Sequence, residues 1–122
     1  MVDIKLGMVE ARFADIIWAH APLTTRELTV LCEAELSWKR TTTYTVLKKL
    51  CERGIFRTEN SAITTLVSRE DFYAMQSEQF VQEKFGGSLP AFLAAFVAHK
   101  APTREELEEI RRMMAAFEEE NR

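Results

Sequence analysis

Residues 37–57 read SWKRTTTYTVLKKLCERGIFR and hold the densest positive charge of the chain. Six lysine and arginine side chains stand there beside a single acid, Glu52, so the stretch carries +5 (six minus one), whereas the whole chain of 122 residues carries −3. The rest of the chain therefore carries −8 (−3 minus +5). Such an asymmetry indicates that one face of the protein binds a polyanion.

The same stretch has the pattern of an amphipathic helix. Apolar side chains recur at helical spacing at Val46, Leu47 and Leu50. Most of the threonines and lysines fall on the opposite side. Ser37 is a plausible N-cap and Gly54 a plausible residue after the C-cap, which predicts a helix over residues 38–53. Such a helix is long enough to lie in the major groove of DNA, and we interpret it as a recognition helix.

The exposed side of this predicted helix is rich in hydroxyl groups. Four threonines and a tyrosine are expected on one surface, although better helix formers exist and solubility does not require them. In a groove, threonine offers a hydroxyl to phosphates or base edges and a methyl to thymine, and tyrosine can reach a phosphate. The alternative, a solvated basic helix, explains the charge but not the hydroxyl groups. The candidate DNA-binding residues are Lys39, Arg40, Thr41, Thr42, Tyr44, Thr45, Lys48, Lys49 and Arg57.

The segments that flank this helix predict a helix-turn-helix with a β wing. An apolar stripe predicts a first helix over residues 9–19, and Thr24 with Glu27 forms a capping box for a second. After Gly54, two short β-rich runs around a turn at residues 59–62 predict a hairpin. The wing has one cation, Arg57, close to an acid, so we expect it to contribute little affinity for DNA.

The remainder of the chain predicts three further helices. Their starts are indicated by Ser68, Ser88 and Thr103, and Gly86-Gly87 separates the first two. They display more apolar surface than three short helices can bury among themselves, so either a partner subunit or the N-terminal domain must cover it, and we expect a partner subunit. The candidate dimerisation residues are Phe80, Phe92, Leu93, Phe96, Val97, Leu107, Ile110, Met114 and Phe117.

The predicted fold class is therefore mainly α with a small β wing. We expect an N-terminal winged helix-turn-helix domain over residues 1–67 and a C-terminal three-helix dimerisation domain over residues 68–122. Neither part contains an apolar run of the ~20 residues that a membrane-spanning helix needs, and the N-terminus has no signal-peptide pattern. We expect a cytoplasmic protein with no membrane insertion.

Cysteine and histidine usage gives no indication of a metal site or an enzyme. Cys32 and Cys51 form no CxxC or CxC motif, and both fall on apolar faces of predicted helices, so we expect buried, reduced thiols. Neither His20 nor His99 has a Ser, Cys or carboxylate at a known catalytic spacing. We predict no catalytic residues, no metal and no cofactor.

Three segments closely resemble the penicillinase-repressor family, the BlaI/MecI type to which the copper-responsive CopY repressors also belong. They are LSWKRTTTYTVLKKLCERGIF, LVSREDFYAMQSEQFVQEKFGGSLPAFLAAF and PTREELEEIRRMM, and the similarity extends from Leu6 to about Phe117. The resemblance implies an N-terminal winged helix that binds DNA and a C-terminal helical domain that dimerises. It implies a homodimeric transcriptional repressor on a palindromic double-stranded DNA operator, with DNA contacts from the positions Thr41, Thr42, Tyr44, Thr45 and Lys48.

Two positions depart from the pattern of this family. CopY-type members carry a C-terminal Cys-x-Cys pair, whereas no cysteine follows Cys51 here, so copper sensing is not expected. Antibiotic-responsive members are inactivated when a membrane-bound metalloprotease sensor signals cleavage of an Asn-Phe bond. The matching pair is Ala95-Phe96, in which the Phe is kept and the Asn is not. This pair is the candidate proteolytic site.

A second class of function also fits the basic helix. A winged-helix interaction module could use the same face for an acidic protein partner, and the dependence of DNA binding on salt separates the two hypotheses.

Overall fold

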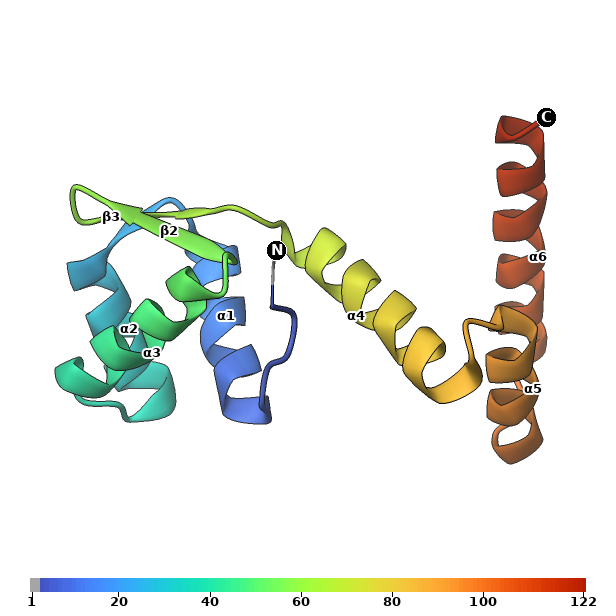
Figure 1. Cartoon of the computed structure of the whole chain (residues 1–122), viewed down its shortest axis with the longest axis horizontal. Coiled ribbons are helices and arrows are strands. Elements are labelled where there is room, and N and C mark those ends of the chain that lie inside the picture. Colours follow the sequence, from blue (N-terminus) through green and yellow to red (C-terminus); the bar gives the residue numbers. More distant parts are fainter. Residues whose placement is uncertain (1–2) are drawn as a thin grey trace. The chain divides into compact units, whose positions relative to one another are not determined.

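The computed structural model describes residues 3–122, which form two compact units that divide between Gln79 and Phe80 (Figure 1). The first unit contains α1 (Met8–His20), β1 (Leu23–Thr24), α2 (Thr25–Leu36), α3 (Arg40–Glu52), β2 (Phe56–Glu59), β3 (Ala62–Thr65) and most of α4 (Arg69–Phe85). The second contains the end of α4 together with α5 (Leu89–His99) and α6 (Arg104–Glu120). Met1 and Val2, the start of the predicted first domain, lie outside the described residues.

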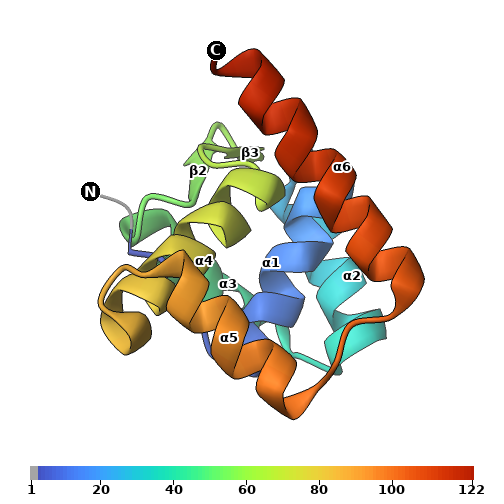
Figure 2. The ribbon, with the colours of Figure 1, turned by 90° about the vertical axis from the view of Figure 1, so that its right-hand side faces the viewer.

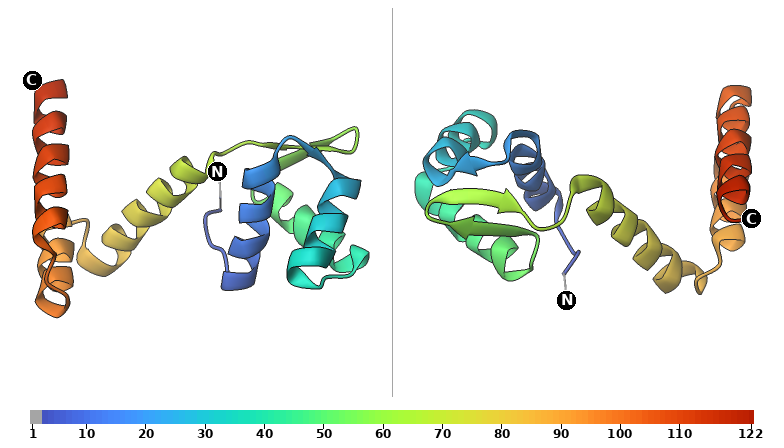
Figure 3. Two further views of the ribbon diagram at one scale, coloured as in Figure 1. Left: turned by 180° about the vertical axis from the view of Figure 1, so that it is seen from behind. Right: turned by 90° about the horizontal axis from the view of Figure 1, so that it is seen from above.

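A three-stranded antiparallel sheet of order β1-β3-β2 forms the wing of the first unit. The register pairs Phe56 with Thr65 in the hairpin and Leu23 with Ile63 at the other side of β3. Asn60 and Ser61 both have positive φ angles, 52° and 63°, as a two-residue turn between twisted strands requires. The predicted hairpin is therefore confirmed, with its strands shifted by a residue or two; Figure 3 shows it from above in its right-hand panel.

The core of the first unit draws one buried side chain or more from every helix and strand. Its largest members are fully buried: Phe13, Ile17, Leu28, Leu50, Ile55, Phe56, Ile63 and Phe72. Trp18 packs at the edge, with its ring centroid 5.4 Å from those of Phe56 and Phe72, and its Nε1 donates to the Val67 carbonyl at 3.0 Å. Each large apolar side chain buried in this way contributes about 1.5–3 kcal/mol. Phe72 belongs to α4, so the start of this helix is part of the first unit.

Local signals explain where most helices begin and end. Thr24 Oγ1 accepts the Glu27 N–H at 3.0 Å, and Glu27 Oε1 accepts the Thr24 N–H. These two hydrogen bonds confirm the predicted capping box. Thr103 and Glu106 repeat the arrangement at the start of α6. Gly86 and Gly87, with φ of 58° and 81°, end α4, and a Cβ on Gly87 would lie 2.8 Å from Gln82 Oε1.

Two expectations about the segment around α3 were wrong. Ser37 is not its N-cap but the left-handed C-cap of α2, with φ of 58°, and Lys39 precedes α3 without a side-chain cap. The helix is accordingly shorter than residues 38–53. Trp38 lies in the turn between the two helices, where its N–H donates to the Cys32 carbonyl at 3.3 Å and its ring is stacked on Phe13 at 5.3 Å.

The mainly α fold with a small β wing is thus confirmed, with three helices and a hairpin in the order of a winged helix and a helical C-terminal part. In the second unit the chain turns between α5 and α6 at residues 100–103 (Figure 2). The domain boundary after Val67 stays a prediction.

Candidate nucleic-acid interface

One side of α3 is buried in the first unit, and the opposite side is exposed to solvent. Its fully or almost fully buried side chains are Thr43, Leu47 and Leu50. The predicted contact residues Arg40, Thr41, Thr42, Tyr44, Thr45, Lys48 and Lys49 are all exposed. Lys39 and Arg57 are exposed as well. The structure therefore brings seven of the nine predicted residues together on one helix, with Lys39 immediately before it and Arg57 apart on β2.

Thr43 does not belong to the exposed surface, so the expectation of four threonines there was wrong. It is fully buried, and its Oγ1 donates to the Lys39 carbonyl at 3.3 Å. Burial raises the pKa of the neighbouring Cys32 thiol, with which the Thr43 side chain forms a hydrogen bond. Cys32 is buried as expected, whereas Cys51 is only half-buried, with its Sγ 3.5 Å from Thr58 Oγ1.

The hydroxyl of Thr45 is already used within the helix. Its Oγ1 donates to the Thr41 carbonyl at 2.9 Å, a bond that threonine commonly makes to the preceding turn. Thr45 is exposed, so its methyl group and the acceptor lone pairs of its hydroxyl remain for a partner. A methyl group at this place suits apolar contact with the methyl of thymine.

Tyr44 connects the exposed face of α3 to the start of α2. The Arg40 guanidinium lies 5.6 Å from the centroid of its ring, a cation–π arrangement. Side-chain hydrogen bonds, first with Arg40 and then with Thr25, lower the pKa of the Tyr44 hydroxyl. Thr25 N–H in turn donates to the Ser61 carbonyl at the wing turn. The N-terminal part of α3, the start of α2 and the wing therefore adjoin one another around Tyr44.

Two of the six cations in residues 37–57 are bound to acids. Arg57 Nη2 lies 3.1 Å from Glu59 Oε2, and Arg53 Nη1 lies 3.4 Å from Glu10 Oε1. The charge of +5 therefore overstates the field that these residues present. The exposed positive charge is concentrated at Lys39, Arg40, Lys48 and Lys49.

In the second unit, large apolar side chains of α5 and α6 are exposed. Eight of the nine predicted dimerisation residues are between 38% and 61% exposed, from Leu107 to Phe117, and Phe92 is half-buried. Phe92 is the centre of an aromatic cluster: its ring lies 6.1 Å from Phe80, 5.6 Å from Phe85 and 6.2 Å from Phe96. No residue of α5 or α6 is buried in the single chain.

Ala95 and Phe96, the predicted proteolytic site, lie in the middle of α5 and are both exposed. Their peptide bond is part of a regular helix. A protease binds its substrate in an extended form, so cleavage here would need local opening of α5 first.

Over residues 3–122, no group of three or more His, Cys, Asp or Glu side chains is placed to hold a metal ion. None of the helices in this range is long and apolar enough to cross a bilayer.

Comparison with known protein families agrees with the order of elements. The sequence profile described as "Penicillinase repressor" matches residues 6–116, which is nearly the whole chain. No individually curated protein matches the chain significantly. Because the match spans both units, the chain belongs to the penicillinase repressor family, a family of transcription regulators.

Proposed function

We propose that this protein represses transcription as a homodimer that binds a palindromic DNA operator, with α3 of each subunit in the major groove. The observation that carries the proposal is the exposed face of α3. It combines threonine, tyrosine and basic side chains on the second helix of a helix-turn-helix, within a chain of the penicillinase repressor family.

The proposed division of labour follows from the chemistry of these side chains. Lys39, Arg40, Lys48 and Lys49 neutralise phosphates, which supplies affinity without sequence preference. Thr41, Thr42 and Thr45 face base edges and supply discrimination. Tyr44 contacts a phosphate together with Arg40, because its hydroxyl forms a hydrogen bond with that side chain. Arg57 contributes little, because Glu59 is its partner.

Dimerisation is proposed to occur through the exposed apolar side chains of α5 and α6. Exposed large apolar residues are concentrated on these two helices, and burying each of them contributes about 1.5–3 kcal/mol. A two-fold dimer uses the same surface on both subunits, so a palindromic site with two half-sites is its natural target.

The test is a binding experiment with the full chain and fragments of the DNA that surrounds its own coding sequence. We expect one fragment to be retained at salt concentrations that release the others, and footprinting of that fragment to protect two inverted half-sites. The slope of log affinity against log salt should be steep, close to −0.9 for each phosphate contact. Equal retention of all fragments would reject operator recognition, and no retention at low salt would favour the acidic protein partner.

Release of the operator is proposed to follow a cut within the dimerisation surface, which would separate the first unit from the end of α5 and from α6. A membrane-bound metalloprotease sensor acting upstream would achieve this by leading to a cut at Ala95-Phe96, as the family pattern implies. A single α3 covers few base pairs. A subunit that has lost its dimerisation surface would therefore bind the operator little better than non-specific DNA.

A further inference from the structure

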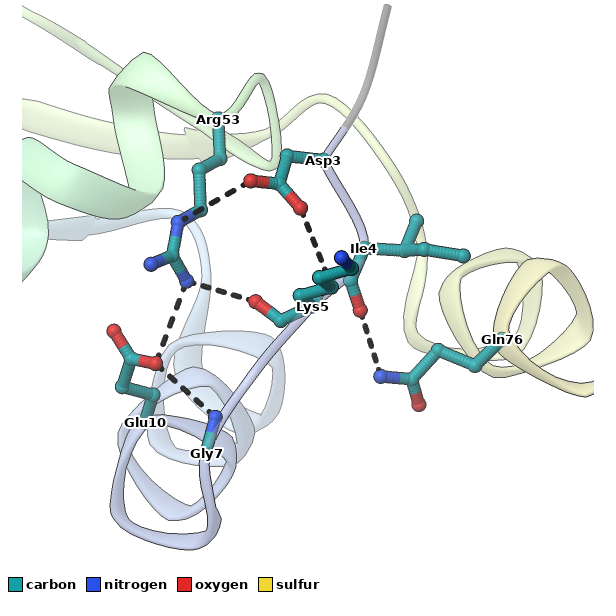
Figure 4. A network of polar contacts seen from close by, with 7 residues as sticks. All are labelled: Asp3, Ile4, Lys5, Gly7, Glu10, Arg53 and Gln76. Carbon is teal, nitrogen blue, oxygen red and sulfur yellow. Dashed lines mark hydrogen bonds and ion pairs between the residues drawn. The ribbon is translucent and has the colours of Figure 1, made fainter. Parts of the chain in front are cut away.

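The side chain of Arg53, at the C-terminal end of α3, is held by several acceptors at once (Figure 4). Its Nη1 donates to the Lys5 carbonyl at 2.8 Å and lies 3.4 Å from Glu10 Oε1. Its Nε lies 3.8 Å from Asp3 Oδ2. The Arg53 carbonyl also accepts the Asp3 N–H at 3.0 Å. Arginine is suited to this place because its planar guanidinium carries five donors, whereas lysine offers one ammonium group.

The acceptors come from residues 3–7, here called the N-terminal segment, and from the first turn of α1. Glu10 accepts the Gly7 N–H at 3.1 Å, which fixes the carboxylate at the start of α1. From the opposite side, Gln76 Nε2 of α4 donates to the Ile4 carbonyl at 2.8 Å. The N-terminal segment therefore joins α1, α3 and α4 within the first unit (Figure 4).

The backbone conformation ends α3 at this point. Gly54, with φ of 81°, donates its N–H to the Cys51 carbonyl, and the Ile55 N–H returns to Leu50, so the helix is closed by a Schellman motif. The Arg53 side chain is only 27% exposed and is directed to acids rather than to solvent. It follows that Arg53 ties the C-terminal end of α3 to the rest of the unit.

We propose that Arg53 is a positioning residue for α3. It fixes the orientation of this helix in the first unit, so that the exposed threonines can meet the base edges of the operator. Groups that recognise a partner must be held within about 0.5 Å of their productive place by a supporting shell. The inference rests on the proposed function and deepens it, because it assigns operator discrimination to a side chain that does not contact DNA.

The rival role for a basic residue on this helix is a phosphate contact, and the two roles predict opposite effects for Glu10. If Arg53 binds phosphate, removing the competing carboxylate with Glu10→Ala frees the guanidinium and strengthens binding to any DNA. If Arg53 positions α3, the same change loosens the helix and lowers discrimination. Arg53→Lys separates the roles again, since it keeps the charge but not the set of hydrogen bonds.

The experiment compares the full chain with Arg53→Lys, Arg53→Gln, Glu10→Ala and the matched control Glu52→Ala, which removes an exposed acid one residue away. Affinity is measured for the duplex selected in the binding experiment above and for a shuffled duplex of the same length. Thermal unfolding establishes that each variant is folded at the assay temperature.

We expect both Arg53 variants and Glu10→Ala to lower the ratio of selected to shuffled affinity by about threefold to tenfold. The salt slope on the shuffled duplex should stay unchanged, and Glu52→Ala should leave the ratio as it is. If Arg53→Gln fails to fold, Glu10→Ala and Arg53→Lys still distinguish the positioning role from a phosphate contact.

The positioning role is overturned if Glu10→Ala strengthens binding to both duplexes as Glu52→Ala does, or if Arg53→Lys behaves as the unmodified chain. If the unmodified chain itself does not distinguish the two duplexes, the proposed function fails. If it does and the variants keep the ratio, only the role of Arg53 fails.

Discussion

Arg57 Nη2 and Glu59 Oε2 lie 3.1 Å apart, two residues apart on the same strand, so the one cation of the wing is paired with an acid. Both side chains are about two-thirds exposed, which makes the pair worth little to stability. Its effect on the local field is larger, because Glu59 cancels a positive charge close to the turn that adjoins α2.

Glu59→Gln should therefore raise affinity for operator and random DNA by the same factor. The change frees Arg57 for a phosphate and removes a repulsive charge, so the salt slope should steepen by up to about 0.9. Fluorescence anisotropy over a salt series measures both quantities. Glu118→Gln, on α6, is the matched control and should change neither; a rise in the operator-to-random ratio for Glu59→Gln would contradict this account.

Thr45→Ser and Lys48→Ala should affect DNA binding differently. Thr45→Ser keeps the hydroxyl that bonds the Thr41 carbonyl and removes only the methyl group, so it should lower operator affinity and leave random affinity unchanged. Lys48→Ala should weaken both and reduce the salt slope by about 0.9. The same anisotropy titrations test the pair, and equal losses on operator and random DNA for both variants would refute the assigned roles.

Phe96→Glu should convert a dimer to a monomer. Phe96 is 53% exposed on α5, and a charge in an apolar seam costs several times the burial it replaces. Sedimentation velocity at micromolar concentration should show a folded monomer with weakened operator binding. Glu109→Gln on α6 is a control that keeps the helix. A monomer for the unmodified chain would exclude the proposed seam.

Cleavage at Ala95-Phe96 should be visible by intact mass. In cells that hold the cognate sensor and inducer, fragments that end at Ala95 should accumulate as transcription rises, whereas the chain without a sensor should stay at full length because its site lies in a regular helix. Induction with every repressor chain intact would exclude proteolysis and favour a ligand or partner protein as the signal.

The free energy of unfolding of the first unit should fall in acid partly through Glu10. Its hydrogen bond from Gly7, and then its attraction to Arg53, lower its pKa below the usual 4.5. A carboxylate with a lowered pKa stabilises the fold above its unfolded pKa, and this contribution is lost as the pH falls through the lower, folded value. The urea midpoint of the unmodified chain should exceed that of Glu10→Ala at pH 7, and the difference should shrink as the pH falls below 4.5.

The sequence predicted elements better than it predicted the partners of individual side chains. Capping residues such as Thr24 and Thr103 interact with a residue three positions later, so the sequence alone predicts the helix starts. The exposed face of α3 followed from helical spacing. Ser37 was misassigned because a serine can either cap a helix start or adopt the left-handed conformation after a helix. Here the Trp38 N–H bonds back to the Cys32 carbonyl, so Ser37 ends α2.

The binding partners of Arg53 could not be foreseen from spacing. Lys5 and Glu10 are 48 and 43 residues away along the chain, and nothing local distinguishes a cation that is tied to such distant acceptors from one that awaits a phosphate. Thr43 is a different case: it lies four and seven residues before Leu47 and Leu50, so helical spacing alone places it on the buried side of α3.

The division of α3 into a buried and an exposed side also bears on how such a repressor could evolve. Leu47 and Leu50 hold the helix in the core, whereas Thr41, Thr42 and Thr45 are exposed and lie outside it. Exposed substitutions of this kind usually change the free energy of unfolding by no more than about 0.5 kcal/mol. A duplicated copy can therefore drift to a new target by replacing these few side chains, with the scaffold inherited unaltered.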